Sequence, residues 1–251
     1  MRSYSNKITL TENGRGIWTL DTIMGCRSGI EADKKGCFGD CYAARNARIY
    51  GYNFTENVLR DFESEKQRLS IIRKIDNLKF PFIRVGNSGD PSENWEHTIK
   101  ILESVKECNK EFVIITKHWN KLTQNQLNRI ALLNICINTS ISAIDENLHD
   151  SISQYESIKP YCNSVLRCVS FDFNTKNENG ASFDLLQNWI FQNYDVLDTI
   201  FRCGKSNYLY KEGIINIKET KFLGKKCFVS KKNKKTYFGN CNNCIEKCGI
   251  K

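Results

Sequence analysis

The sequence contains only three prolines, and it has no low-complexity tract and no internal repeat. No run approaches the roughly 18 apolar residues that a membrane span needs, and the N-terminus lacks the apolar core of a signal peptide. The P-loop is absent, so kinase and NTPase functions have no support, and neither H-E-x-x-H nor G-x-S-x-G occurs. These absences predict a cytoplasmic protein with no membrane partner.

The composition that is present predicts a globular protein. Hydrophobic residues make up 40% and charged residues 26% of the chain, which is enough to bury a core. The length allows one large α/β domain with a small appendage. The net charge of +9 fits two interpretations equally, which are an anionic partner such as nucleic acid and a solvated, lysine-rich surface.

Apolar runs alternate with helical patterns six times along the chain. The strand-like runs are Ile17–Ile23, Phe80–Val85, Phe112–Thr116, Ile135–Ile141, Val165–Phe171 and Val196–Phe201. Near-continuous apolar strands separated by helices predict an α/β fold with a parallel sheet, either open and doubly wound or closed towards a barrel. The first helical stretch is predicted to run from Ala43 to Leu78. The pattern ends near residue 205, so residues 1–205 form one domain and residues 206–251 a cysteine-rich extension.

In either architecture, chemistry lies at the carboxyl ends of the parallel strands. This rule selects residues that should meet at one edge of the sheet. They are Cys26, the loop Gly86–Asp90, Lys117, Ser140, Ser142, Asp172, Arg202 and Cys203. Lys117 is the leading polar candidate for catalysis, because an apolar strand delivers it to this edge.

Twelve cysteines in a reducing compartment indicate metal or redox chemistry rather than disulfides. Three of them, Cys26, Cys37 and Cys41, have the spacing C-x10-C-x3-C in the glycine-rich loop Gly25–Tyr42. Thiolates bind soft metals such as zinc and the irons of iron–sulfur clusters. Zinc sites usually have a C-x2-C pair and four protein ligands. The loop has no such pair and no histidine nearby, so it favours a cluster held by three thiolates with one iron left open.

A second set of cysteines lies in the extension, at Cys227, Cys241, Cys244 and Cys248, with the spacing C-x13-C-x2-C-x3-C. Four ligands that include a C-x2-C pair predict a second metal centre. A structural zinc ribbon and an auxiliary iron–sulfur cluster both fit this spacing. A zinc ribbon here would be suited to contact nucleic acid, because its loop carries Lys231, Lys232, Lys234 and Lys235.

The first cysteine loop and two later motifs together resemble the radical S-adenosylmethionine (radical SAM) superfamily. The hallmark of that family is a three-cysteine loop after the first strand of a partial (β/α)6 barrel, usually spaced C-x3-C-x2-C. The segment Cys41–Gly51 (CYAARNARIYG) is similar to the passage from loop to helix in phage-type and spore photoproduct lyase-like members. Gly86–Pro91 (GNSGDP) stands where the family carries its GGE motif, and Thr116–His118 resembles a TK step after the third strand.

The resemblance covers roughly residues 15–205 and implies a partial (β/α)6 TIM-like barrel with defined cofactor sites. The three cysteines of the loop would hold a 4Fe–4S cluster, and its fourth iron would bind the amino and carboxylate groups of S-adenosylmethionine (SAM). A reducing partner such as flavodoxin or ferredoxin would supply the electron that cleaves the sulfonium C–S bond. The usual product is a 5′-deoxyadenosyl radical, which abstracts a substrate hydrogen. The residues expected to contact SAM are Tyr42, Gly86, Asn87, Ser88, Gly89 and Asp90, with Asp90 at the amino group.

Other residues near the strand ends complete the expected site. Ser140 is expected at the ribose or the substrate. Arg167 and Arg202 could each hold the SAM carboxylate or an anionic substrate, and a structural ion pair is the alternative for both. Cys203 could donate a hydrogen atom to a substrate radical, with packing or metal contact as its alternatives.

Three functions are open at this point. The leading expectation is a radical SAM enzyme with an unidentified substrate, which includes modification of nucleic acid. The second is a non-enzymatic, zinc-stabilised protein that binds nucleic acid, motivated by the net charge and the tail. The third is a peptide-modifying radical SAM enzyme, although the sequence contains no separate peptide-recognition domain.

Overall fold

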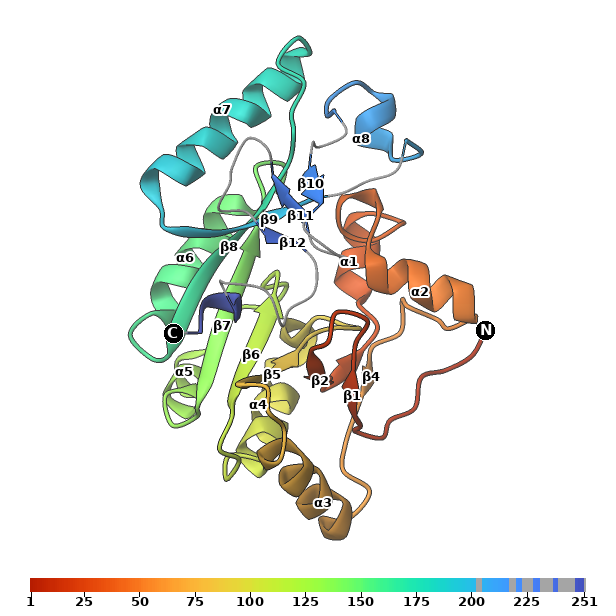
Figure 1. The fold of residues 1–251 in the computed structure, drawn as a ribbon, viewed down its shortest axis with the longest axis vertical. Coiled ribbons are helices and arrows are strands. Elements are labelled where there is room, and N and C mark those ends of the chain that lie inside the picture. Colours follow the sequence, from red (N-terminus) through yellow and green to blue (C-terminus); the bar gives the residue numbers. More distant parts are fainter. Residues whose placement is uncertain (202–204, 217–219, 223–227, 231–236, 239–246, 251) are drawn as a thin grey trace.

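The protein is built around a seven-stranded sheet in which only the first strand is antiparallel to its neighbour (Figure 1). The computed structural model describes residues 1–201, 205–216, 220–222, 228–230, 237–238 and 247–250. Across the sheet the order is β1 (Leu10–Glu12), β2 (Trp18–Leu20), β5 (Phe82–Val85), β6 (Glu111–Thr116), β7 (Ile135–Ile141), β8 (Asn163–Ser170) and β9 (Val196–Ile200). The parallel strands follow one another in sequence order without a reversal. The predicted α/β class with a mostly parallel sheet is confirmed, and the arrangement is compatible with a partial barrel.

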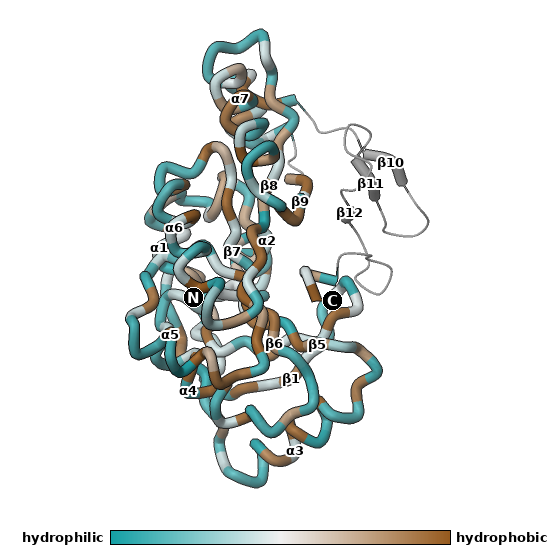
Figure 2. Tube along the Cα trace, turned by 90° about the vertical axis from the view of Figure 1, so that its left-hand side faces the viewer, coloured by the Kyte–Doolittle hydropathy of each residue, from teal (hydrophilic) through white to brown (hydrophobic). Residues whose placement is uncertain are grey.

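Five helices follow the strands of the sheet and pack on one of its faces. They are α3 (Glu65–Asp76), α4 (Trp95–Ser104), α5 (Gln124–Ile130), α6 (Leu148–Ile158) and α7 (Glu178–Asn193). Successive side chains of a strand point to opposite faces, so Phe112 and Ile114 of β6 pack with the helices while Val113 lies on the other face. Hydrophobic and hydrophilic stretches follow one another along the chain (Figure 2). Within the described residues, no helix combines the length and the apolar character needed to cross a membrane.

The face of the sheet opposite the helices is covered in part by residues 247–250. The hydrophobic cluster on this face contains Ile17, Phe82, Val113, Cys136, Cys248 and Ile250. Asn138, on the same face of β7, donates from its Nδ2 to the backbone oxygen of Cys248 at 3.1 Å. The described end of the extension is therefore packed against the main sheet. Earlier in the extension, three short strands pair in antiparallel fashion, namely β10 (Thr220–Phe222), β11 (Phe228–Ser230) and β12 (Tyr237–Phe238).

The remaining elements surround the first cysteine loop. They are β3 (Ile23–Met24), α1 (Arg27–Ala32), α2 (Tyr42–Tyr50), β4 (Val58–Leu59) and α8 (Tyr208–Lys211). The prediction of one helical stretch from Ala43 to Leu78 is wrong. Helix α2 ends at Tyr50, because Gly51 takes φ +74° and its N–H bonds back to the last turn. The chain then runs extended and pairs β4 with β3, and a new helix starts where the Ser64 side chain accepts from the backbone N–H of Gln67.

Replacing Ile114 by alanine should lower the free energy of unfolding by about 2–5 kcal/mol, measured by urea denaturation. Ile114 is fully buried between β6 and the helices, so the truncation leaves a cavity. Leu132→Ala is the matched control, because Leu132 is 83% exposed and its truncation should change stability by less than about 0.5 kcal/mol. Equal losses in the two variants would contradict this account of the core.

Candidate active site

The three cysteines of the first loop stand at the starts of successive helical turns. Cys26 precedes α1, Cys37 opens a short 3-10 turn, and Cys41 precedes α2. Cys26 is buried, the other two are half-buried, and all three are free thiols. Cys37 and Cys41, which follow Cys26 by 11 and 15 positions in the sequence, thus lie on the same side of the loop as Cys26.

The three thiols line one pocket of about 180 Å³ at the carboxyl ends of β5, β6 and β7. We call it the cysteine pocket. Six further residues from the predicted site line it, namely Gly86, Asn87, Gly89, Asp90, Lys117 and Ser140. Nine of the eighteen residues assigned to the site from sequence therefore share one cavity.

The cysteine loop and the loop after β5 meet through their backbones. The N–H of Gly25 donates to the carbonyl oxygen of Ser88 at 3.0 Å, and Gly25 forms a parallel bridge with Gly89. A Cβ on Gly89 would lie 2.5 Å from the carbonyl oxygen of Ile23 and 2.6 Å from that of Gly25. Only glycine permits this approach, and the approach places the strand-end loop beside Cys26.

Asp90 ties the loop after β5 to the end of β6. Its Oδ1 accepts from the N–H and the hydroxyl of Ser92 at 2.9 and 2.8 Å, and from the Thr116 hydroxyl at 2.7 Å. Its Oδ2 accepts from the backbone N–H of Lys117 at 2.7 Å. Burial raises the pKa of this carboxyl group, and the same hydrogen bonds oppose that rise. Asp90 therefore orders the wall of the cysteine pocket by its own bonds.

Lys117 is held in a buried ion pair. Its Nζ lies 2.7 and 2.6 Å from the carboxylate oxygens of Asp145, and 4.4 Å from the centre of the Phe38 ring. Phe38 follows Cys37 in the cysteine loop, so Lys117 joins β6 to the loop and to the segment after β7. Burial raises the pKa of the Cys37 thiol to about 12, and the positive charge of Lys117 acts in the opposite direction. Lys117 is thus placed to stabilise negative charge on Cys37.

Glu93 is a site residue that the sequence analysis missed. Its Oε1 accepts from the Cys26 thiol at 3.4 Å and from the N–H of Ser28 at 2.8 Å. Its Oε2 accepts from the Ser28 hydroxyl at 3.2 Å and from the Asn57 amide at 2.7 Å. The available signal was an acidic residue in the first turn after Asp90, a position where helix starts favour carboxylates. Burial raises the pKa of Cys26, and the charges of Asp90 and Glu93 add to the effect.

Tyr42 and Ser88 lie in a neighbouring pocket of about 170 Å³ rather than in the cysteine pocket. We call it the tyrosine pocket, since Tyr4, Tyr42, Tyr50 and Tyr52 line it. Tyr4 and Tyr52 stack there with their ring centres 4.6 Å apart. Asn87 and Ala43 line both pockets, so the two cavities share a wall.

The other predicted site residues are placed apart from the cysteine pocket or fall outside the described residues. Arg167 pairs in register with Ser140 on the neighbouring strand, but it does not line the pocket. Its buried Nη1 has no hydrogen-bond partner among the residues that the structure describes. Cys248 packs on the face of the sheet opposite the helices. The remaining predicted site residues lie outside the described part of the chain, and they are Arg202, Cys203, Cys227, Cys241 and Cys244.

Lys117→Met should lower the free energy of unfolding by about 3–5 kcal/mol, because it leaves the carboxylate of Asp145 buried without its cation. Both side chains of the pair are 10% exposed. Adding Asp145→Asn to the variant should recover part of the loss in urea denaturation. Lys121→Met is the matched control, since Lys121 and Asp150 pair at 64% and 66% exposure and should contribute less than about 1 kcal/mol. An equally small effect at Lys117 would contradict a buried pair.

His118 should make the protein less stable in mild acid. Burial lowers its pKa from 6.5 to about 4, so the folded state favours the neutral ring, which also bonds the Thr139 hydroxyl at 2.9 Å. This stability is present above pH 6.5 and is lost as the pH falls towards 4, by about 2 kcal/mol between pH 7.5 and pH 5. Urea unfolding of His118→Gln should show a flatter pH dependence than the unsubstituted protein, whereas exposed His149→Gln should leave the dependence unchanged.

Comparison with known proteins adds no relative whose function could be transferred. No family model matches the chain. No curated protein matches it either. The case for a function therefore rests on the cysteine pocket and on the residues that hold it at the carboxyl ends of the parallel strands.

Proposed function

We propose that the chain is a radical SAM enzyme that holds a 4Fe–4S cluster through Cys26, Cys37 and Cys41. The observation that carries the proposal is the shared pocket. Three free thiols face the loop Gly86–Asp90 across one cavity at the carboxyl ends of three parallel strands. In parallel α/β folds this edge is where ligands bind.

The donor set suits a cluster better than a single metal ion. Among the described residues, no three His, Cys, Asp or Glu side chains gather closely enough to hold one ion. A single zinc, with Zn–S bonds of about 2.3 Å, needs its ligand sulfurs to converge on one point. Thiolates at different corners of an iron–sulfur cubane lie further apart. Gly29 leaves space beside two of the sulfurs, because a Cβ there would lie 2.8 Å from the Cys26 sulfur and 3.8 Å from the Cys37 sulfur.

The fold supports the same proposal. Six parallel strands, β2 and β5–β9, follow one another in order, with α3–α7 on one face of the sheet. We infer a partial (β/α)6 barrel formed by residues 1–205, with residues 206–251 as its extension. The second metal centre, at Cys227, Cys241, Cys244 and Cys248, belongs to that extension and holds either an iron–sulfur cluster or zinc.

The chain's own residues would bind and orient SAM. When bound, the cluster and SAM supply reductive cleavage of the sulfonium C–S bond, driven by one electron from a donor such as flavodoxin or ferredoxin. Gly86, Asn87, Gly89 and Ser140 line the cavity and are the residues proposed to contact SAM. Asp90 keeps their loop in place, and Asp21 accepts from the backbone N–H groups of Gly86 and Asn87. Tyr42 and Ser88 lie next door, where the tyrosine pocket offers aromatic faces to a nucleobase.

The charged residues around the pocket would set the electrostatics of the thiolates. Lys117 offers a positive charge beside Cys37, and Glu93 holds a negative charge beside Cys26. Arg202 is proposed to bind the SAM carboxylate or an anionic substrate, and Cys203 to return a hydrogen atom to a substrate radical. Arg167 does not line the cysteine pocket, so we do not assign it to SAM. The substrate is nucleic acid or a peptide within this proposal.

Anaerobic reconstitution with iron and sulfide tests the proposal directly. The unsubstituted chain should bind a cluster and, once reduced, convert SAM to 5′-deoxyadenosine and methionine. The triple variant Cys26→Ser/Cys37→Ser/Cys41→Ser should lose about four irons per chain and all SAM cleavage, whatever the extension retains. Cys108→Ser is the matched control, since Cys108 is buried in the core away from the pocket and should leave iron content and cleavage unchanged.

Two results would contradict the proposal. One is a reconstituted cluster that never cleaves SAM under reduction. The other is zinc as the only metal, together with tight, salt-dependent binding of DNA or RNA, which would favour the non-enzymatic nucleic-acid-binding function.

A further inference from the structure

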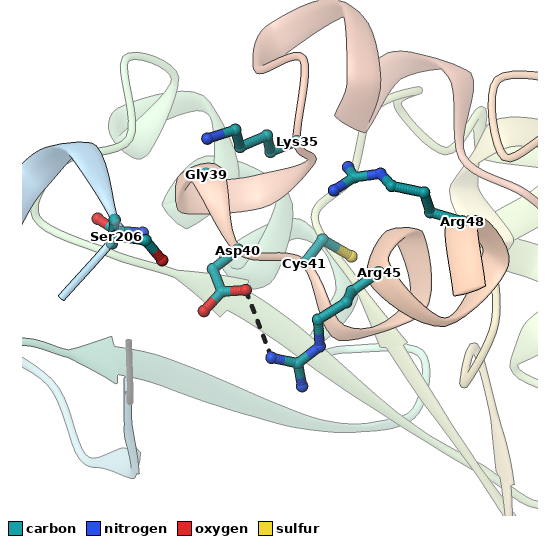
Figure 3. Close-up of a pocket in the computed structure, with 8 residues that line it drawn as sticks. Lys35, Gly39, Asp40, Cys41, Arg45, Arg48 and Ser206 are labelled. Atoms are coloured by element: carbon teal, nitrogen blue, oxygen red, sulfur yellow. Dashed lines mark ion pairs between the residues drawn. The ribbon is translucent and has the colours of Figure 1, made fainter. Parts of the chain in front are cut away.

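A third cavity, of about 250 Å³, is lined by Cys41 together with charged residues of the cysteine loop and α2 (Figure 3). We call it the basic pocket. Its lining includes Lys35, Asp40, Cys41, Arg45, Arg48 and Asn207. Cys41 also lines the cysteine pocket, so the two cavities are neighbours that share this residue.

The charge inside the basic pocket is unbalanced. Three cations share the lining with one carboxylate, and among the described residues the one ion pair that they form joins Arg45 to Asp40 at a long 3.7 Å. In the described part of the chain, neither Lys35 nor Arg48 has an ion pair. Two positive charges are therefore available to a ligand in a concave site.

The walls of the basic pocket are set by the fold rather than by mobile side chains alone. Arg45 and Arg48 are three residues apart on α2, so they leave the helix on one face and reach towards the loop that carries Lys35 and Asp40 (Figure 3). The opposite wall is fixed by Asn207, which is 4% exposed and donates from Nδ2 to the carbonyl oxygen of Phe38 at 2.9 Å. The segment after the last strand of the sheet is thus bonded to the cysteine loop.

We propose that the basic pocket binds a phosphate group of an anionic ligand. Guanidinium groups pair with phosphate oxygens bidentately, and an ammonium adds a point charge. A cavity of this volume admits one such group with its neighbouring atoms, whereas docking an acidic protein needs on the order of 1,200 Å² of buried surface. The ligand is either a nucleic-acid strand or a small phosphorylated molecule, since both present the same group.

The position of the basic pocket gives the ligand a role. A phosphate bound there lies beside the Cys41 thiol, so the rest of the ligand reaches the edge of the cysteine pocket. The inference that this ligand is the substrate rests on the proposed function, but the binding itself does not. The triple cysteine variant described above should therefore still bind phosphate, which separates failure of the cluster proposal from failure of this one.

Binding is measured with the full-length chain by isothermal titration and by fluorescence anisotropy. The probes are adenosine 5′-monophosphate, adenosine, a short single-stranded DNA, and an oligomer of the same base sequence with an uncharged backbone. We expect the two phosphate-bearing probes, or one of them, to bind, and the uncharged partners to bind at least tenfold more weakly. Arg48→Gln should weaken binding about tenfold, whereas Arg73→Gln, an exposed arginine on α3, should not change it.

Two further measurements keep the test decisive. Arg48→Lys should retain part of the phosphate affinity. If Arg48→Gln is destabilised, seen as a lower midpoint of urea unfolding, Lys35→Gln tests the pocket independently and should also weaken phosphate binding. For the DNA probe, the slope of log affinity against log salt should fall by about 1 in Arg48→Gln. If the DNA binds and the monophosphate does not, the ligand is a nucleic acid. If the monophosphate binds and the DNA does not, the ligand is a small molecule.

The proposal is overturned if neither phosphate probe binds, or if Arg48→Gln and Lys35→Gln bind as tightly as Arg73→Gln. It is also overturned if only reduced flavodoxin binds, with a loss in Arg48→Gln. That result would make the basic pocket part of a docking surface for an acidic electron donor.

Discussion

The candidate site depends on one buried carboxylate. Asp90 accepts four hydrogen bonds, three on one oxygen and one on the other, and these bonds join the loop after β5 to the end of β6. A buried carboxylate is costly unless its oxygens are satisfied, and here donors from two strand ends satisfy them. Because the loop after β5 also carries Ser88 and Gly89 against Gly25, the same carboxylate indirectly sets where Cys26 lies.

Around Asp90, charged side chains of opposite sign lie beside different thiols of the site. Cys26 lies beside Glu93 and Cys37 near Lys117, so one thiol meets a negative neighbour and another a positive one. Lys117 is in turn paired with Asp145, and the negative charge of Asp145 reduces the positive potential that Lys117 produces in the pocket. The site therefore combines deep burial, which opposes charge on sulfur, with cations that favour it, namely Lys117 at Cys37 and Arg45 at Cys41.

The fold was predictable from the sequence because its strands are apolar on both faces. The runs at 112–116 and 135–141 correspond to β6 and β7 with boundaries that match or differ by one residue. Local backbone chemistry was harder to read. Gly51 ends α2 inside a stretch whose apolar spacing continues, and the first predicted strand divides into β2 and β3 around Asp21 and Thr22.

The site was predictable to the extent that it depends on strand ends. Lys117 directly follows β6 and Asp90 lies in the loop after β5, so the topology of the sheet brings them to the same edge. Glu93 was missed because its role comes from a turn of helix folding back on the cysteine loop, which no periodicity encodes. Tyr42 follows Cys41 in sequence, yet the helix that begins there turns its ring into the adjacent cavity.

Cys41 lines both the cysteine pocket and the basic pocket, and this has a thermodynamic consequence. A charge that enters either cavity changes the electrostatic potential at the same sulfur atom. Occupancy of one cavity must then alter affinity in the other, and by linkage the alteration is equal in both directions. A single side chain thus makes the two binding equilibria one coupled system, without any movement of the backbone.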